Sequence, residues 1–301
     1  MTMNSKQACM LALAAVLQAC AGLRSGPERV ATRTTPTTPT AACAVGAAVP
    51  EKLLQPASIL LFGEIHGSKE LPSFFGEAVC STADARVPVE VGLEIPKPEQ
   101  ATVETFLAST GAASDVAALI STSFWSREFQ DGRSSQATVD LLERLRQLRA
   151  QGLPIHVFLF DLDESSPGSE RDKLMAENIS SHARAHPEAL TMALTGEVHA
   201  WKTKGAPWNP DFLPMGWHLV NGGAQVHSLG RATPAGTAWN CVGSSASNCG
   251  SHETKAIAVL PDDQAAGIEL LPEPSKRGYD GMYVTLSLTT SPPAQSSDDA
   301  R

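Results

Sequence analysis

Hydrophobic positions along the chain form short aliphatic runs that alternate with longer segments of helical period. Apolar runs bounded by turn residues predict buried strands at residues 59–62, 87–95, 155–160 and 190–194. Apolar residues at three- and four-residue spacing predict helices at residues 68–80, 99–108, 114–120, 136–150 and 169–185. This alternation is typical of an α/β fold, a mostly parallel central sheet covered by helices.

The pattern changes in the last third of the chain. After Gly216 we expect no further helix, only short and partly antiparallel strands at residues 217–220, 225–229, 255–260 and 282–288. We therefore expect one α/β domain over residues 51–290 with a β-richer C-terminal third. Residues 291–301 are rich in Pro, Gln, Ser and Asp, which predicts a disordered tail.

The N-terminus has the pattern of a targeting segment. A basic start at Lys6 precedes an apolar stretch, residues 10–17, that is too short to span a bilayer. The following Leu17-Gln18-Ala19-Cys20 resembles the bacterial lipobox, in which the cysteine is lipidated and begins the mature chain. The alternative is an ordinary secretory signal cleaved near Ala19 or Ala21. Both interpretations predict that the chain is exported. The first also predicts a signal peptide at residues 1–19 and a lipoprotein anchored to a membrane of the cell envelope.

Residues 20–50 are rich in Thr and Pro. Such a segment cannot bury a core and stays extended. It would serve as a tether that holds the domain away from the membrane.

Cysteine usage agrees with export. Beyond the signal segment and Cys20, four cysteines remain, and these allow three pairings. Cys241 and Cys249 flank a Gly/Ser/Asn loop and form the favoured local pair, which leaves Cys43 with Cys80. A four-cysteine zinc site would need close C-x-x-C pairs that the chain lacks.

One tetrapeptide pattern occurs twice, each time after an aliphatic run. The copies are Gly63-Glu64-Ile65-His66 and Gly196-Glu197-Val198-His199. Because side chains alternate along an extended chain, the Glu and His of each copy should project to the same side. The alternative is that these polar residues only cap the next helix or bond loop amides. The repetition favours a functional site with two carboxylate–imidazole pairs.

Other acidic residues follow the remaining strands: Glu94 ends the second strand, and Asp161 and Asp163 end the third. Ligands of open α/β sheets bind at the carboxyl edge of the strands, so these side chains should converge there. The chemistry has two forms. Glu64, His66, Glu94 and His199 could hold a divalent metal that activates water. Alternatively, Glu64 or Glu197 is a general base and the histidines donate protons without metal.

The same residues carry a family resemblance. Gly63-Glu64-x-His66, Leu93-Glu94, Gly196-x-x-His199-Ala200 and the segment from Arg171 to Ile179 resemble the ChaN/Tiki/erythromycin-esterase-like superfamily over residues 59–200. The resemblance implies an α/β fold with Glu64, His66, Glu94 and His199 at the sheet edge. It also implies divergent activities: haem binding by envelope lipoproteins, metal-dependent peptidases and hydrolysis of a macrolide ester. A haem- or iron-binding lipoprotein without turnover is therefore the rival to a hydrolase.

Some residues outside the motifs could contact a ligand. Arg127 or Arg133 could clamp an anionic group, although both could be plain surface arginines. Trp201 could line a pocket or pack in the core. The remaining histidines are scattered and are expected to be ordinary surface or core residues: His156, His182, His186, His218, His227 and His252.

The net charge restricts the class of ligand. A charge of -9 and the lack of a basic run argue against nucleic acid. We expect a small-molecule or peptide ligand, and contact with a membrane only through the lipid anchor.

Overall fold

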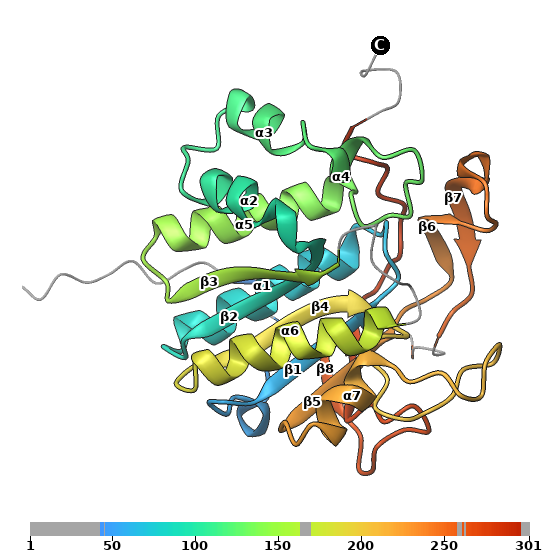
Figure 1. Cartoon of the computed structure of the whole chain (residues 1–301). Helices are drawn as coiled ribbons and strands as arrows, with labels where there is room; N and C mark the ends of the chain where they lie inside the picture. Colours follow the sequence, from blue (N-terminus) through green and yellow to red (C-terminus); the bar gives the residue numbers. More distant parts are fainter. Residues whose placement is uncertain (1–42, 45, 163–169, 258–260, 262, 296–301) are drawn as a thin grey trace, which may run out of the picture. The chain divides into compact units, whose positions relative to one another are not determined.

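The computed structural model describes residues 43–44, 46–162, 170–257, 261 and 263–295 (Figure 1). The expected signal peptide, Cys20, most of the tether, Asp163, Ser169 and the end of the tail lie outside these residues. Within the described residues, no helix combines the length and apolar character that a bilayer span requires.

A seven-stranded sheet forms the centre of the domain, in the order β3-β2-β4-β1-β5-β9-β8. Neighbouring strands run parallel except β8 and β9, which pair antiparallel. The strands are β1 (Ile59–Glu64), β2 (Val89–Pro96), β3 (Ile155–Asp161), β4 (Leu190–Gly196), β5 (Val226–Ala232), β8 (Gly267–Leu270) and β9 (Gly281–Val284). The expected α/β fold is confirmed, and so are all four strands predicted in its first two thirds.

Helices cover both faces of this sheet, because its inner strands are apolar on both sides. In β1, Leu60 and Phe62 face one core and Ile59 and Leu61 face the other. The first core lies under α1 (Glu70–Asp84), α2 (Gln100–Leu107), α3 (Ala113–Leu119), α4 (Ser123–Ser126) and α5 (Gln136–Ala150). The second lies under α6 (Arg171–Ala185) and α7 (Met215–Asn221), and Figure 1 shows α6 in front of the sheet, running along β4. Short 3-10 turns occur at Glu51–Leu53, Lys97–Glu99 and Ala246–Asn248.

The strand order determines which strand ends meet. The chain passes from β1 to β2 across a gap that β4 later fills, so β4 lies between them. The carboxyl ends of β1, β4 and β2 are therefore neighbours. Such a reversal of strand order is where α/β sheets bind ligands.

Two predicted strands of the C-terminal third are wrong. Residues 217–220 belong to α7, whose Met215 and Leu219 are buried four residues apart as a helix requires. A short apolar run fits either state, and here helical packing against α6 decided it. Residues 255–257 form no strand, and Ile257 is exposed. The remainder of that prediction, residues 258–260, lies outside the described part.

The C-terminal third also contains an antiparallel hairpin that was not predicted. β6 (Gly236–Cys241) pairs with β7 (Cys249–Thr254), and Cys241 lies opposite Cys249. These two cysteines form a disulfide, and a second one joins Cys43 to Cys80 of α1. Both expected pairings are confirmed, as is the β-rich character of this third.

Contacts continue beyond residues 51 and 290, the limits expected for the domain. Ala47 and Val49 are buried in the first core. At the other end Ser291 is buried, with its N–H donating to the Gly67 carbonyl and its hydroxyl accepting from the Ala137 N–H. Residues on both sides of the expected domain thus take part in its packing.

Candidate functional site

Three adjacent strands end at the site. Glu64 is the last residue of β1 and lies in register with Gly196, the last residue of β4. Glu94 lies near the end of β2, on the other side of β4. Both carboxylates are buried. The convergence expected at the carboxyl edge of the sheet is therefore present in the structure.

The first tetrapeptide has the geometry expected from its spacing. His66 Nδ1 donates to Glu64 Oε1 at 2.9 Å. The chain then turns at Gly67, whose φ of +70° favours glycine. A Cβ there would lie 2.1 Å from the Trp239 carbonyl oxygen, because the β6–β7 hairpin packs directly on this turn. Gly67 thus lets the hairpin cover the site.

Glu94 is the centre of the cluster. Its Oε2 accepts hydrogen bonds from the Thr195 hydroxyl at 2.6 Å and the Gly196 N–H at 2.7 Å. Its Oε1 accepts from Arg171 at 2.7 Å and lies 3.5 Å from His66 Nε2. The same oxygen is 3.8 Å from His199 Nε2. One carboxylate therefore links both histidines of the two motifs.

The second tetrapeptide does not repeat the geometry of the first. β4 ends at Gly196 and residues 197–200 form a turn, so the alternation of an extended chain no longer applies. Glu197 points to Arg231, with Oε2 2.8 Å from Nε. Only His199 faces Glu94. The structure brings Glu64, His66, Glu94 and His199 together but directs the Glu197 carboxylate elsewhere.

His199 is oriented by two residues at the start of α6. Its Nδ1 lies 2.7 Å from Asp172 Oδ1, and its Nε2 lies 3.0 Å from an Arg171 nitrogen. Because arginine can only donate, Nε2 accepts and Nδ1 carries the proton that bonds Asp172. The first turn of α6 thus sets the tautomer of His199.

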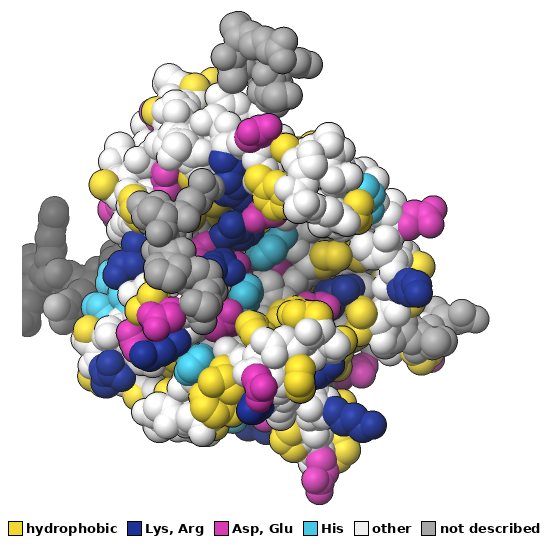
Figure 2. All heavy atoms as spheres, turned by 45° about the vertical axis from the view of Figure 1, so that its right-hand side comes forward, with side chains coloured by type: hydrophobic (Ala, Val, Ile, Leu, Met, Phe, Trp, Pro, Cys, Tyr) yellow, Lys and Arg dark blue, Asp and Glu magenta, His cyan; other side chains and the backbone are white. Residues whose placement is uncertain are grey.

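A cavity of about 250 Å³ opens beside these residues. In Figure 2, where the right-hand side of Figure 1 is turned forward, histidine, basic and acidic side chains gather in a hollow between loops. Gly196 lies in the lining, and a Cβ on it would be 3.1 Å from His66 Nε2. Glu64 Oε2 is buried without a hydrogen-bond partner among the described residues. The lining residues are Glu64, Ile65, His66, Asp131, Gly196, Glu197, Val198, His199 and Asn240.

Burial and charge shift the pKa values of this cluster in different directions. Burial raises the pKa of Glu64 above its usual 4.5. Burial alone would lower the pKa of His66, but the Glu94 charge and the bonds to Glu64 and Glu94 raise it to about 10. Burial also opposes ionisation of Glu94, yet the charges of His66 and Arg171 hold its pKa well below its usual range. The site therefore pairs a cationic His66 with a carboxyl, Glu64, that ionises less readily than usual.

Arg127 and Arg133 are both engaged in ion pairs, so they match neither the plain surface arginines nor the ligand-binding arginines that the sequence suggested. Both bind Asp131, Arg127 at 2.5 Å and Arg133 at 2.8 Å. Arg133 also binds Asp161, whose other oxygen accepts from Arg171 Nε at 2.8 Å. Asp161 is the last residue of β3, as the sequence predicted, and it is buried. These ion pairs link the loop of residues 127–133 to Arg171 and Glu94. They hold one wall of the site in place.

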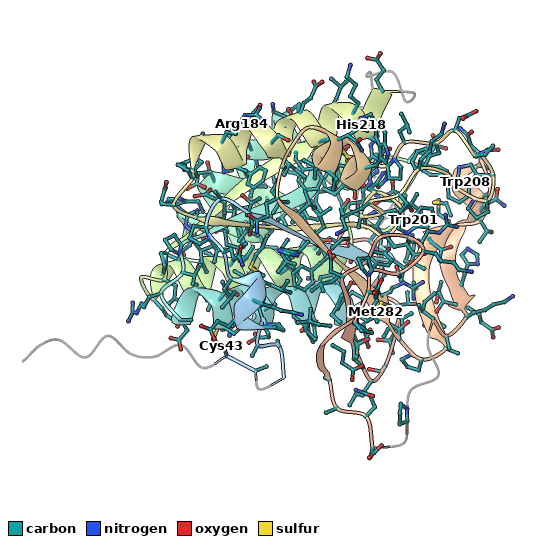
Figure 3. The ribbon with its side chains drawn as sticks, turned by 90° about the horizontal axis from the view of Figure 1, so that it is seen from below. Cys43, Arg184, Trp201, Trp208, His218 and Met282 are labelled. Atoms are coloured by element: carbon teal, nitrogen blue, oxygen red, sulfur yellow. A yellow bond between two sulfur atoms is a disulfide. The ribbon has the colours of Figure 1, made fainter. Side chains whose placement is uncertain are left out.

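Trp201 lies apart from this cavity. It is buried in the second core, with the Arg277 guanidinium 4.0 Å above its ring. Figure 3 shows it beside Trp208, their ring centroids 6.4 Å apart. Trp201 is not among the residues that line the cavity, so its placement is that of a packing residue.

Several residues of the site carried no local signal in the sequence. Both tyrosines support the motif turns: Tyr283 donates to the Gly63 carbonyl at 2.8 Å and Tyr279 to the Glu197 carbonyl at 2.9 Å. The Arg171–Asp172 pair belonged to a segment with family resemblance, but its contact with His199 requires the tertiary structure. Asp131 could not be distinguished from other loop acids.

The carboxyl-edge residues do not fit a metal ion well. The Arg171 guanidinium already lies at hydrogen-bond distance from Glu94 Oε1 and His199 Nε2, two of the four expected ligand atoms. The second oxygen of Glu94 is bound by Thr195 and Gly196. A divalent cation would have to displace or approach a fixed positive charge. Among the described residues, the Glu/His group with converging ligand atoms is a different one, Glu90 with His182 and His186.

Comparisons with known proteins establish the fold. No protein-family model and no curated protein matches the chain. An erythromycin esterase mutant solved in its open conformation is 13% identical with a TM-score of 0.60, over 81% of this chain and 94% of that one. A Bacillus cereus protein is 12% identical with a TM-score of 0.53, over 81% and 92%. A succinoglycan biosynthesis protein is 10% identical with a TM-score of 0.52, over 82% and 94%. The resemblance predicted from the motifs is thus confirmed as a shared fold.

Proposed function

We propose that the chain hydrolyses carboxylic esters by metal-independent acid–base catalysis at the carboxyl edge of the sheet. The observation that carries the proposal is the Glu64–His66 pair beside the cavity. Glu64 contacts one nitrogen of the His66 ring, and Glu94 lies near the other. The fold shared with an erythromycin esterase supports an ester as the substrate class. The cavity is slightly smaller than the roughly 300–1,000 Å³ of typical ligand pockets, so we expect it to hold the ester group while the rest of the substrate lies outside.

Glu64 is the proposed general base. Its Oε1 is held by His66, and its Oε2, which has no hydrogen-bond partner among the described residues, can accept a proton from water. A raised pKa makes this carboxylate a stronger base than an exposed one. Glu197, the matching residue of the second motif, is paired with Arg231 and is not proposed as the base.

His66 is the proposed proton donor. In hydrolysis, the water oxygen bonds to the ester carbonyl carbon and its proton passes to Glu64. The carbon–oxygen bond to the alcohol then breaks, and the alcohol oxygen takes the Nε2 proton of His66. Return of the proton from Glu64 to His66 restores the starting state. The raised pKa of His66 keeps the proton available at neutral pH.

The test is hydrolysis of p-nitrophenyl esters and of erythromycin by the purified chain and its variants. Glu64→Gln and His66→Asn should each lower kcat/KM by about 10²–10⁴-fold. Glu197→Gln, at the matching position of the second tetrapeptide, is the control and should retain most of the activity. Activity should rise with pH through the raised pKa of Glu64 and fall above about 10, the pKa of His66. Equal rates for Glu64→Gln and the wild type, or activity abolished by a chelator and restored by a metal, would reject the mechanism.

Haem binding gains no support from the tyrosines. Tyr is one of the side chains that can ligate haem iron. Here both phenol groups are buried donors to backbone carbonyls, and burial raises the pKa of each above its usual value. A haem titration that produces a ligated-haem absorbance band would favour the uptake function over hydrolysis.

We also propose that the chain works outside the cytoplasm as a lipoprotein anchored through Cys20. Two disulfides support an oxidising compartment. The lipobox-like sequence ending at Cys20 supports the anchor. Fatty-acyl labelling should be lost in Cys20→Ser, and labelling that persists in this variant would reject the anchor.

A further inference from the structure

A second cluster of histidines surrounds a buried glutamate at the opposite edge of the sheet. Glu90 is near the start of β2, four residues before Glu94, or about 13 Å along the strand. It lies in register with His156 of β3. His182 and His186, at the end of α6, complete the group. The four residues come from three elements and were unremarkable in the sequence.

The distances place the imidazole nitrogens around one carboxylate. His182 Nε2 is 2.7 Å from Glu90 Oε2. His186 Nδ1 is 3.6 Å and His156 Nδ1 is 3.0 Å from Glu90 Oε1. The ligand atoms of Glu90, His182 and His186 all lie within 4.8 Å of one another. Ligands of a tetrahedral zinc ion, each about 2.0–2.1 Å from the metal, are roughly 3.3 Å apart, so small side-chain movements would suffice.

The local structure fixes His182 and His186 on the same side. His182 is in the last turn of α6 and His186 directly follows the helix, and the ring nitrogens of both lie toward Glu90. The His182 ring stacks on Phe158 of β3 at a centroid distance of 3.8 Å and an interplanar angle of 11°. This packing limits rotation of the ring and holds Nε2 toward Glu90. Such support is what orients metal-binding histidines.

The charges around Glu90 differ from those around Glu94. The described ion pairs of Glu90 are with the three imidazoles, and no Lys or Arg is among them. Imidazole can be neutral and offer a lone pair, whereas guanidinium cannot. Two nitrogens and a carboxylate oxygen are a common ligand set for zinc and related divalent ions.

We propose that Glu90, His182 and His186 bind a divalent transition-metal ion of the zinc class, with His156 within reach as a fourth ligand. The side chain of His156 is 72% exposed, so an ion can enter from solvent. Bound there, the ion joins β2 to the last turn of α6 and, through His156, to β3. It should therefore stabilise the fold, because a ligand that binds only the folded state shifts unfolding to higher temperature.

The experiment titrates the metal-stripped full chain with Co²⁺, whose visible absorption reports nitrogen and oxygen coordination, followed by displacement with Zn²⁺. We expect one equivalent of binding and a Zn²⁺-dependent rise in unfolding temperature. The double variant His182→Ala/His186→Ala should lower the affinity by on the order of tenfold or more. His182 is in α6, where alanine is well tolerated, His186 is the residue that follows this helix, and circular dichroism in chelator checks the fold. His186→Gln supplies a second, more conservative test.

The control variants are His252→Ala, a partly exposed histidine outside the cluster, and His66→Asn at the carboxyl edge. Both should bind Co²⁺ as the wild type does. Absence of binding by the wild type would overturn the inference. So would binding that survives in His182→Ala/His186→Ala and is lost in His66→Asn, which would move the metal to the carboxyl edge. Ester hydrolysis is measured separately, so failure of one proposal leaves the other testable.

Discussion

Strand β2 carries two buried glutamates, Glu90 near its start and Glu94 near its end, and each meets histidines and α6. The difference lies in the cations. Glu94 is bound by Arg171 from the first turn of α6, whereas Glu90 is bound only by imidazoles among its described ion pairs. A fixed guanidinium keeps Glu94 ionised and competes with any metal ion. Imidazoles, in contrast, can bind a metal ion, so Glu90 and the histidines around it can serve together as metal ligands. Similar residue types on one strand therefore support different chemistry according to what α6 supplies at each end.

The largest expected effect separates the two glutamates directly. Glu94→Gln removes the buried carboxylate that pairs with both Arg171 and His66, leaves Arg171 only its Asp161 pair among the described residues, and should lower the free energy of unfolding by about 3–5 kcal/mol. Glu90→Gln should cost about 1 kcal/mol, because the glutamine amide can keep hydrogen bonds to the imidazole partners. Urea unfolding without added metal measures both. Equal losses would remove the distinction between the two edges.

Two buried threonines of β4 sharpen the comparison at the level of single hydrogen bonds. Thr195 donates to Glu94, while the hydroxyl of Thr191, in register with Glu90, is buried without a partner among the described residues. Thr195→Val should lower the free energy of unfolding by about 1.5–3 kcal/mol because it removes a bond to a charged group. Thr191→Val should be nearly neutral or stabilising. The prediction is wrong if thermal unfolding shows the larger loss for Thr191→Val.

The close packing of the carboxyl edge can be tested at Gly196. A Cβ there would lie 3.1 Å from His66 Nε2 and 3.3 Å from His199 Cδ2. Gly196→Ala should push the imidazoles apart, cost about 1–3 kcal/mol of stability, and lower ester hydrolysis. Gly267→Ala in β8 is the control, since its Cβ would meet only the Gly46 carbonyl at 3.5 Å. Wild-type activity and stability in Gly196→Ala would contradict the packing described here.

The most gradual effect is the dependence of stability on pH. The pKa of His66 is raised from 6.5 to about 10 in the fold, so its stabilising contribution is complete below 6.5 and is lost as pH rises through 10. The lowered pKa of Glu90 has its effect at acidic pH, because its contribution to stability is lost as the pH falls below 4.5. His66→Asn should therefore flatten the decline in unfolding temperature between pH 7 and 10. Glu90→Gln should leave this decline unchanged, and a decline that persists in His66→Asn would assign it to another group.

The two tetrapeptides show how far a motif can be interpreted without coordinates. The spacing correctly predicted that Glu64 and His66 share a side, since His66 Nδ1 lies 2.9 Å from Glu64 Oε1. The same spacing failed for Glu197 and His199, because β4 ends at Gly196, one motif position earlier than β1 does, and Arg231 binds the Glu197 carboxylate. A repeated pattern thus located the site but could not specify the roles of its copies.

What the amino-acid sequence determined by itself is local. Hydrophobic period placed the central strands β1 to β4 and the helix Gln136–Ala150, and cysteine positions indicated both disulfides. Tertiary structure alone decided which atoms meet. It packed residues 217–220 as part of a helix, joined Arg171 to Glu94, and gathered His156, His182 and His186 around Glu90. The reason is physical: periodicity reflects a residue's own segment, whereas these contacts depend on strand order and on where α6 begins and ends over the sheet.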